Sequence, residues 1–206
     1  MSLYQHARDG NAERLRDAIG SDSAAVRRRA AEFLGEVGDP DEQATVDALL
    51  RAATTDEDGE VRGAAVDALD EIGGGALEQL LSELTGTKGS EAEWVTARKF
   101  ARALQADRPE LRMAAANALG RLDDASGLSH LVDALEDDDP RVRLRAAQAC
   151  GTFADPRAIP GLTARLDDEP RVRRAAANAL GSIGTDQALA ALLDLLDEPD
   201  ESLRRI

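Results

Sequence analysis

The sequence predicts an all-α fold of stacked helix pairs, and two observations support that prediction. The segment 140–166 recurs at 170–196, and Val142 and Val172 stand 30 residues apart within the shared string Pro-Arg-Val-Arg. Self-similarity at a fixed period of roughly 20–50 residues indicates a repeat array, in which each unit buries its apolar face against its neighbours. Hydrophobic residues, rich in Ala and Leu, make up 43% of the chain, but aromatic residues only 2%. Such a core forms through close helix contacts between small side chains.

Each repeat begins with an amphipathic helix, here called helix A. Its first apolar position, the anchor, is followed by further apolar residues 4, 8 and 11 positions later in the repeats. At about 100° per residue these positions fall on one face of a helix. The anchors, each followed directly by an arginine, are Val26, Val61, Leu111, Val142, Val172 and, as a partial match, Leu203.

A second helix, helix B, follows helix A after a short segment rich in Gly, Asp and Pro. In the repeat anchored at Leu111, Leu131 and Leu135 stand 20 and 24 residues after the anchor, and apolar residues recur at these offsets in other repeats. Pro140 follows Asp139 at the expected start of a helix A, which is the arrangement of a capping residue followed by proline at the first helical position. An acidic loop closes each unit and leads to the next.

The string Asp-Pro-Arg-Val-Arg-x-x-Ala-Ala-x-x-Leu-Gly resembles the HEAT repeat, specifically the short-repeat type named after phycobilin lyase subunits. The resemblance covers 21–206 and is strongest over 107–198. It implies a right-handed α-solenoid with the A helices on the convex side and the B helices lining the concave side. Members of this family mostly act as adaptors or regulatory subunits, so the resemblance implies a similar role.

We expect a single solenoid over 1–206, with about five HEAT-like helix pairs and a degenerate N-terminal pair. The N-terminal pair keeps the register, because Leu15 and Ile19 precede Val26 by 11 and 7 residues. The expected segments are a cap at 1–20, repeats at 21–58, 59–85, 107–138, 139–168 and 169–198, an inserted helix at 86–106 and a truncated C-terminal stub at 199–206.

The repeat spacing fails between Val61 and Leu111, which are 50 residues apart, whereas the neighbouring gaps are 35, 31 and 30. The inserted segment holds the only tryptophan, Trp94, and two interpretations of it stay open. It covers the seam where the stacking is disrupted, or it anchors a partner, since exposed aromatic residues dominate binding hot spots. The unfinished C-terminal edge, where a sixth helix A starts and stops, is a further candidate for docking a partner or a second copy of the chain.

The charge balance bears on both partner and environment. The net charge is −15, from 25 basic and 40 acidic residues, and only Lys88 and Lys99 are lysines. Nucleic-acid binding requires a basic face that displaces counterions from phosphates, so no nucleic-acid partner is expected. An acidic, lysine-poor composition resembles that of proteins from salt-adapted organisms, in which screening makes self-repulsion tolerable.

The chain also carries little that indicates a catalytic or membrane protein. Cys150 is the only cysteine and occupies a core position of helix A, so a reducing, cytoplasmic location is expected. No apolar run approaches the ~20 residues that span a bilayer, so no membrane partner is expected. Deoxyhypusine hydroxylases of the HEAT type carry His-Glu pairs, whereas His6 and His130 are followed by Ala7 and Leu131. We therefore expect no catalytic, cofactor or metal site.

The arginines that follow the anchors are expected to form a structural ladder along the stack. Their recurrence in register is what stacking alone requires, although the same residues are also suited to an acidic partner. The acids expected to pair with them are Asp39, Asp139, Asp155 and Glu169. The ladder arginines are Arg27, Arg62, Arg112, Arg143 and Arg173.

The function that the sequence favours is a non-catalytic protein–protein interaction scaffold or adaptor, which binds another protein along the B helices. The alternative is a regulatory or chaperone-like subunit of an enzyme complex, as the resemblance to phycobilin lyase subunits implies; an autonomous enzyme is the third hypothesis. The residues expected to contact the partner follow the core positions of the B helices or lie near the insertion: Trp94, Ser129, His130, Asp133, Thr163, Ala190, Leu193 and Asp194.

Overall fold

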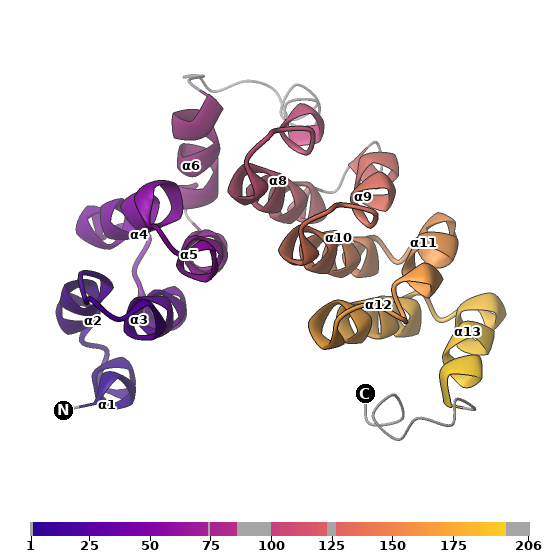
Figure 1. Cartoon of the computed structure of the whole chain (residues 1–206), viewed down its shortest axis with the longest axis horizontal. Helices are drawn as coiled ribbons and strands as arrows, with labels where there is room; N and C mark the ends of the chain where they lie inside the picture. The colour runs from indigo at the N-terminus through magenta and orange to yellow at the C-terminus, as the bar shows by residue number, and fades with distance from the viewer. Residues whose placement is uncertain (1, 74, 86–99, 123–126, 197–206) are drawn as a thin grey trace. The chain divides into compact units, whose positions relative to one another are not determined.

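The computed structural model describes residues 2–73, 75–85, 100–122 and 127–196, and every regular element within them is a helix (Figure 1). The prediction of an all-α solenoid of helix pairs is therefore confirmed for the described residues. The pattern of contacts divides the chain into two compact units, 1–90 and 91–206, and each is described by itself.

The first unit contains a short helix pair followed by two longer pairs. Helices α3 and α5 are helix A of their repeats and pack against each other, while α2, α4 and α6 stand at the B positions. The short α1 packs on α2 and α3. The helices of this unit are α1 (Leu3–Arg8), α2 (Ala12–Ile19), α3 (Ala24–Val37), α4 (Gln43–Thr55), α5 (Gly59–Ile72) and α6 (Ala76–Thr85).

The second unit places the A helices α8, α10 and α12 in one layer and the B helices α9, α11 and α13 in another (Figure 1). Helix α10 packs against both α8 and α12, and α11 contacts α13. A helical turn at 100–103 precedes these pairs, and Phe100 and Leu104 are buried there. The elements are α8 (Pro109–Arg121), α9 (Leu128–Ala134), α10 (Pro140–Phe153), the 3₁₀ turn η2 (Pro156–Ala158), α11 (Ile159–Ala164), α12 (Pro170–Ile183) and α13 (Asp186–Leu196).

The A helices α5 and α10 begin at aspartates that cap them. The Asp139 carboxylate accepts a hydrogen bond from the Arg141 amide, and Pro140 occupies the first turn of α10. In the first unit, the Asp58 carboxylate caps α5 in the same way. Glu169 precedes α12 without a side-chain cap, which agrees with its lower preference for that position.

The core consists of the repeated apolar stripe. The anchors Val61, Leu111, Val142 and Val172 are buried, together with the alanines four residues later. Cys150 is fully buried at a position that is leucine in most other repeats, and burial raises the pKa of its thiol to about 12. The thiol therefore stays protonated and acts as a small apolar side chain.

Two predicted features fall outside the described residues. The first is the segment 86–99 of the inserted helix, which contains Trp94. The same holds for the C-terminal stub, 199–206. These predictions stay predictions.

Candidate functional site

A groove runs between two neighbouring B helices of the second unit, α11 and α13. Its volume is about 470 Å³, and its lining combines apolar side chains with two carboxylates and two neutral polar groups. The α11–α13 groove is lined by Ile159, Pro160, Thr163, Leu166, Asp167, Gln187, Ala190, Ala191 and Asp194.

The groove gathers three of the residues that the sequence predicts as partner contacts. Thr163 comes from α11, and Ala190 and Asp194 come from successive turns of α13. Leu193 lies next to Asp194 on the same helix, and 60% of its surface is exposed. Together with Leu189, one turn earlier and 46% exposed, it forms an apolar stripe on the surface of α13.

The other predicted contacts within the described residues lie one repeat away, on α9. Ser129 and Asp133 are exposed there, and His130 is half-buried. The Ser129 hydroxyl lies 3.4 Å from Nδ1 of His130. None of the three lines the α11–α13 groove.

The groove is negatively charged. Asp167 and Asp194 are both exposed at its edge, and no arginine or lysine belongs to its lining. An exposed carboxylate beside an apolar floor suits a side chain that is apolar along its stem and cationic at its end. The groove therefore favours a ligand that buries apolar surface against its floor and carries positive charge near Asp167 and Asp194.

The ladder arginines make a second, structural arrangement. In the second unit, Nε and Nη2 of Arg143 donate to the two carboxylate oxygens of Asp168, at 2.7 and 2.8 Å. Nη1 of the same guanidinium donates to the main-chain carbonyls of Asp137 and Asp138, at 2.8 and 3.2 Å. One side chain thus joins the loop before its own helix to the loop after the following helix B.

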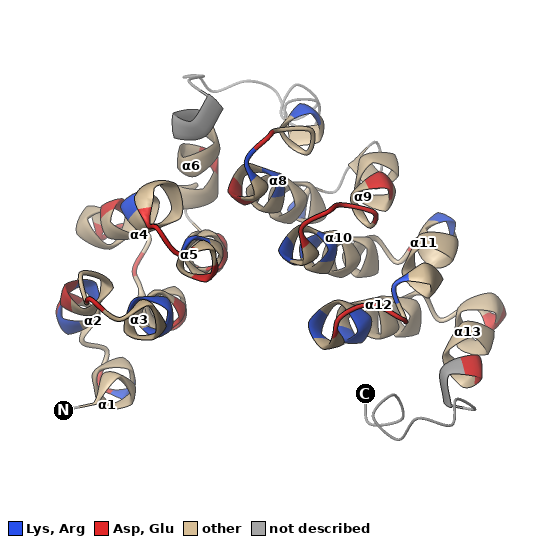
Figure 2. Ribbon diagram, in the orientation of Figure 1, with Lys and Arg blue, Asp and Glu red and all other residues tan. Residues whose placement is uncertain are grey.

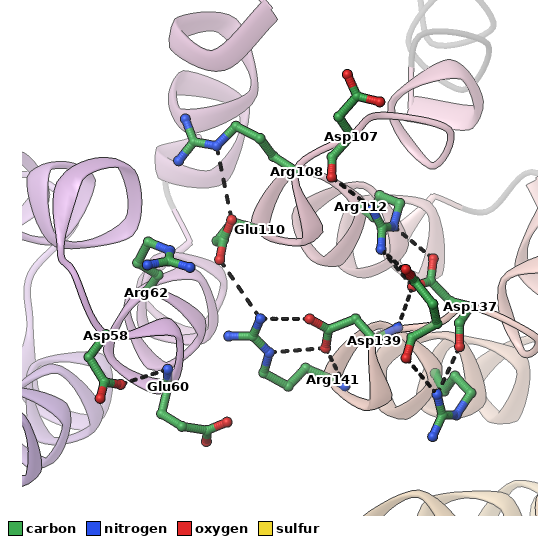
Figure 3. Close-up of polar contacts among 12 residues, drawn as sticks. Asp58, Glu60, Arg62, Asp107, Arg108, Glu110, Arg112, Asp137, Asp139 and Arg141 are labelled. Atoms are coloured by element: carbon green, nitrogen blue, oxygen red, sulfur yellow. Dashed lines mark hydrogen bonds and ion pairs between the residues drawn. The ribbon is translucent and has the colours of Figure 1, made fainter.

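The same geometry recurs at Arg112, which Figure 3 shows beside Asp137. Its Nε and Nη2 donate to the Asp137 carboxylate at 2.7 and 2.8 Å, and its Nη1 donates to the carbonyls of Ala106 and Asp107. In the first unit, Arg27 pairs with Asp56 through Nε and Nη2 at 2.8 and 2.9 Å.

Among the residues that the structure describes, three aspartates connect consecutive repeats. Each accepts from one arginine through its carboxylate and from the next arginine through its main-chain carbonyl. Asp168, for example, accepts from Arg143 and Arg173, and Asp137 accepts from Arg112 and Arg143. Asp56 links Arg27 and Arg62 in the same manner.

These aspartates are not the acids that the sequence indicated. Asp139 pairs instead with Arg141, and Asp155 with Arg157, in each case two residues along the chain. A carboxylate at a cap position accepts from main-chain amides two residues along the chain. In contrast, an aspartate in the loop, four or five positions before an anchor, reaches the arginine of the preceding repeat. The missed signal is an aspartate at that offset before Val61, Val142 and Val172.

Glu110 is a buried carboxylate in the first turn of α8. Arg108 and Arg141 lie on either side of it, at 4.0 and 3.8 Å between the nearest charged atoms (Figure 3). A negative charge at a helix N-terminus is favoured by the helix dipole, and the two arginines compensate for its burial. This cluster, like the ladder, stabilises the stack.

The ladder lowers the pKa of two of its carboxylates. Hydrogen bonds from Arg27 lower the pKa of Asp56 most strongly, and burial only partly opposes them. Burial alone would raise the pKa of Asp168, but hydrogen bonds from Arg143 and the Glu169 amide, with nearby positive charge, lower it overall. Both carboxylates are therefore ionised in the folded protein at neutral pH.

Acidification is expected to destabilise the protein through these carboxylates. An aspartate in the unfolded chain titrates at about pH 3.9. Because the folded pKa lies below that value, the stabilisation is complete above it and is lost as the pH falls through the folded pKa. Denaturant unfolding from about pH 7 to about pH 3 measures the loss.

The variant Asp168→Asn tests this prediction. It should be less stable at neutral pH, and its stability should change less with acidification, because one linked group is gone. Asp167→Asn, one residue away and exposed, serves as control and should keep the wild-type profile. A wild-type profile in Asp168→Asn would contradict the assignment.

The described residues also bear on metal and membrane binding. They contain no group of three His, Cys, Asp or Glu side chains arranged to hold a metal ion. None of the described helices is both long and apolar enough to cross a membrane.

Comparison with known proteins matches the family model of HEAT repeats to residues 12–105, 97–171 and 128–206. A HEAT repeat-containing taxis protein of Halobacterium salinarum is 42% identical over 126 residues, which are 59% of this chain. The matched region spans 29% of the length of that relative.

Two solved structures share the fold at 23% identity. Human deoxyhypusine hydroxylase superposes with a TM-score of 0.52, covering 98% of this chain and 84% of the other. A chain from the complex of CpcE and CpcF of the Nostoc phycocyanin lyase gives 0.51, covering 95% and 73%. At this identity the likeness concerns the fold alone.

Proposed function

Because the chain belongs to the HEAT-repeat family, we propose that it is a protein-interaction adaptor that binds a partner protein through the B helices α11 and α13. The observation that carries this proposal is the α11–α13 groove, which combines an apolar floor with the carboxylates of Asp167 and Asp194. It lies on the helix layer from which the sequence predicts partner contacts.

The groove has the composition of a binding surface. Ile159 and Leu166 contribute apolar floor, and Leu193 adds an exposed leucine on the adjoining side of α13. An apolar patch with a polar rim marks an interaction site on a soluble protein, because its burial releases water from the apolar surface. Two packed helices hold the patch in place, so little conformational entropy is lost on binding.

The Halobacterium relative indicates a cellular process in which such an adaptor could act. It is a HEAT repeat-containing taxis protein. By analogy with that relative, we infer that the adaptor described here takes part in taxis. The acidic, lysine-poor composition of this chain is typical of proteins from salt-adapted organisms. The binding experiments are therefore carried out in high potassium chloride.

Ala190→Arg is expected to abolish partner capture. Ala190 is exposed and lines the groove, so an arginine at this position fills the space that the partner would occupy. Tagged protein is used to capture proteins from native, high-salt lysate, and captured proteins are quantified by mass spectrometry. Ala25→Arg, at an exposed alanine of α3, carries the same substitution far from the groove along the chain and should retain the partner.

The outcomes separate the hypotheses. A partner that Ala190→Arg loses and Ala25→Arg keeps supports the α11–α13 groove. Equal capture by both variants contradicts it, provided that circular dichroism shows the same helix content. Co-purification of one enzyme at fixed stoichiometry would instead support the alternative role of a regulatory subunit.

A further inference from the structure

A second groove lies on the opposite helix layer, between the A helices α10 and α12. Its volume is about 480 Å³. No aspartate or glutamate belongs to its lining, although the whole chain contains 40 acidic residues. The α10–α12 groove is lined by Leu144, Gln148, Gly151, Thr152, Arg171, Arg174, Ala175, Asn178, Ala179 and Ser182.

The polar side chains of this groove are matched between the two helices. Gln148 and Asn178 stand 30 residues apart, at the same position of consecutive repeats, and so do Thr152 and Ser182. Neighbouring A helices thus present an amide beside an amide and a hydroxyl beside a hydroxyl. The two hydroxyls donate to main-chain carbonyls of their own helices. The amide groups of Gln148 and Asn178 are therefore the ones suited to hydrogen bonds with an extended main chain.

Two exposed arginines, Arg171 and Arg174, line the other end of the groove. Figure 2 shows basic residues at the start of α12. Within the part of the chain that the structure describes, neither Arg171 nor Arg174 forms an ion pair or a side-chain hydrogen bond, whereas Arg143 and Arg112 are fully engaged in the ladder. Both guanidinium groups therefore present free donors beside the groove.

The lack of acidic residues along this face distinguishes α12 from the A helices of the first unit. At the positions that correspond to Asn178 and Ser182, helix α3 carries Glu32 and Glu36, and α5 carries Asp67 and Glu71. Burial and the charges of Glu36, Asp67 and Asp70 raise the pKa of Glu71, which reports the acidic surroundings there. Stacking of A helices therefore does not require neutral side chains at these two positions.

We propose that the α10–α12 groove binds an acidic peptide segment of a partner protein in an extended conformation. The carboxylates of the segment contact Arg171 and Arg174, and its main chain contacts Gln148 and Asn178. Arg171 and Ser182 are 11 residues apart, which corresponds to about 16 Å along a helix at 1.5 Å per residue. An extended chain covers that length with about five residues.

Charge complementarity identifies the occupant. A guanidinium binds a carboxylate through paired hydrogen bonds, and the absence of acids from the lining leaves that capacity for an external group. An elongated groove with matched amides along it accommodates a main chain rather than a single small anion. This site is separate from the α11–α13 groove, so its test does not depend on the adaptor surface proposed above.

Binding of fluorescein-labelled hexaglutamate, followed by fluorescence anisotropy, provides the test. Hexaglutamine and hexalysine carrying the same label are the comparison peptides. The measurement uses the lowest potassium chloride concentration at which circular dichroism shows full helix content, because salt screens exposed charges. We expect hexaglutamate to bind and hexaglutamine to bind at least about tenfold more weakly.

Two double variants separate the effect of the groove arginines from the effect of the net charge of the protein. Arg171→Gln/Arg174→Gln should weaken hexaglutamate binding about tenfold, because each exposed ion pair contributes modestly. Arg8→Gln/Arg14→Gln removes the same charge from exposed arginines of α1 and α2 and should leave binding unchanged. Equal weakening by both pairs would show nonspecific attraction and overturn the proposal.

A third variant tests the peptide groove itself. Asn178→Asp replaces an amide with a carboxylate of the same shape. It should weaken hexaglutamate binding, because it adds a negative charge to the part of the groove that lies beyond the two arginines. If Asn178→Asp binds like the wild type, or if inorganic phosphate competes as effectively as unlabelled hexaglutamate, the arginines form a small anion site. Either result would overturn the proposal of a peptide groove.

Discussion

Arg143→Gln is expected to lower the free energy of unfolding by about 3 kcal/mol, because it leaves a buried carboxylate without its main partner. The Arg143 and Asp168 side chains are only 14% and 7% exposed. The substitution also removes the donor to the carbonyls of Asp137 and Asp138. Chemical denaturation in high potassium chloride measures the change, and a buried pair of this kind is screened little by salt.

Arg157→Gln is the matched control. Arg157 also pairs with an aspartate through two hydrogen-bonding nitrogens, but its side chain is 65% exposed, and its partner, Asp155, lies two residues away. An exposed pair contributes less than about 1 kcal/mol. A loss in Arg143→Gln no larger than in this control would mean that the ladder does not stabilise the stack.

Gly120→Ala is expected to destabilise the protein by about 1–2 kcal/mol, because two A helices approach too closely for a methyl group. A Cβ added to Gly120 of α8 would lie 2.8 Å from the Cβ of Ala149 and 3.1 Å from its Cα, in α10. Neither atom belongs to a flexible side-chain end, so the helices must separate. Thermal unfolding of the variant and the wild type measures the effect.

Gly181→Ala tests the same substitution without the contact. Gly181 occupies the corresponding position of α12, and an added Cβ meets nothing within 4 Å. Alanine should therefore stabilise this variant by about 0.5–1 kcal/mol, through the lower backbone entropy of its unfolded chain. Destabilisation at Gly181 or stabilisation at Gly120 would contradict the assigned role of close helix approach.

The local structure of each repeat could be predicted because it depends on neighbours in sequence. Val142 and Val172 mark the buried stripe of their helices, and Asp139 with Pro140 marks a helix start. The partner of Arg143 could not be predicted, because Asp168 is 25 residues away and lies beside Glu169 and Asp167. Only the packing of one repeat on the next decides which carboxylate reaches the guanidinium.

The candidate surfaces were predictable to a similar extent. Thr163 and Ala190 follow core positions of their B helices, which predicts an exposed position on that layer, but the groove between them depends on how α11 and α13 pack. The α10–α12 groove was missed, although the repeated polar pairs Gln148 and Asn178 carried its signal. Periodicity of polar residues indicates a surface as directly as periodicity of apolar residues indicates a core.

The bridging aspartates have a consequence for how the array loses its structure. Asp137 accepts hydrogen bonds from Arg112 through its side chain and from Arg143 through its main chain. Neither of the two repeats that these arginines belong to can therefore unfold without leaving a hydrogen-bonding group of the other unpaired. In a one-dimensional array, this strengthens the coupling between neighbours relative to the intrinsic stability of each helix pair. The helices from α8 to α12 should therefore behave as one cooperative block. In the second unit, fraying is then expected at α13, which follows the last aspartate bridge.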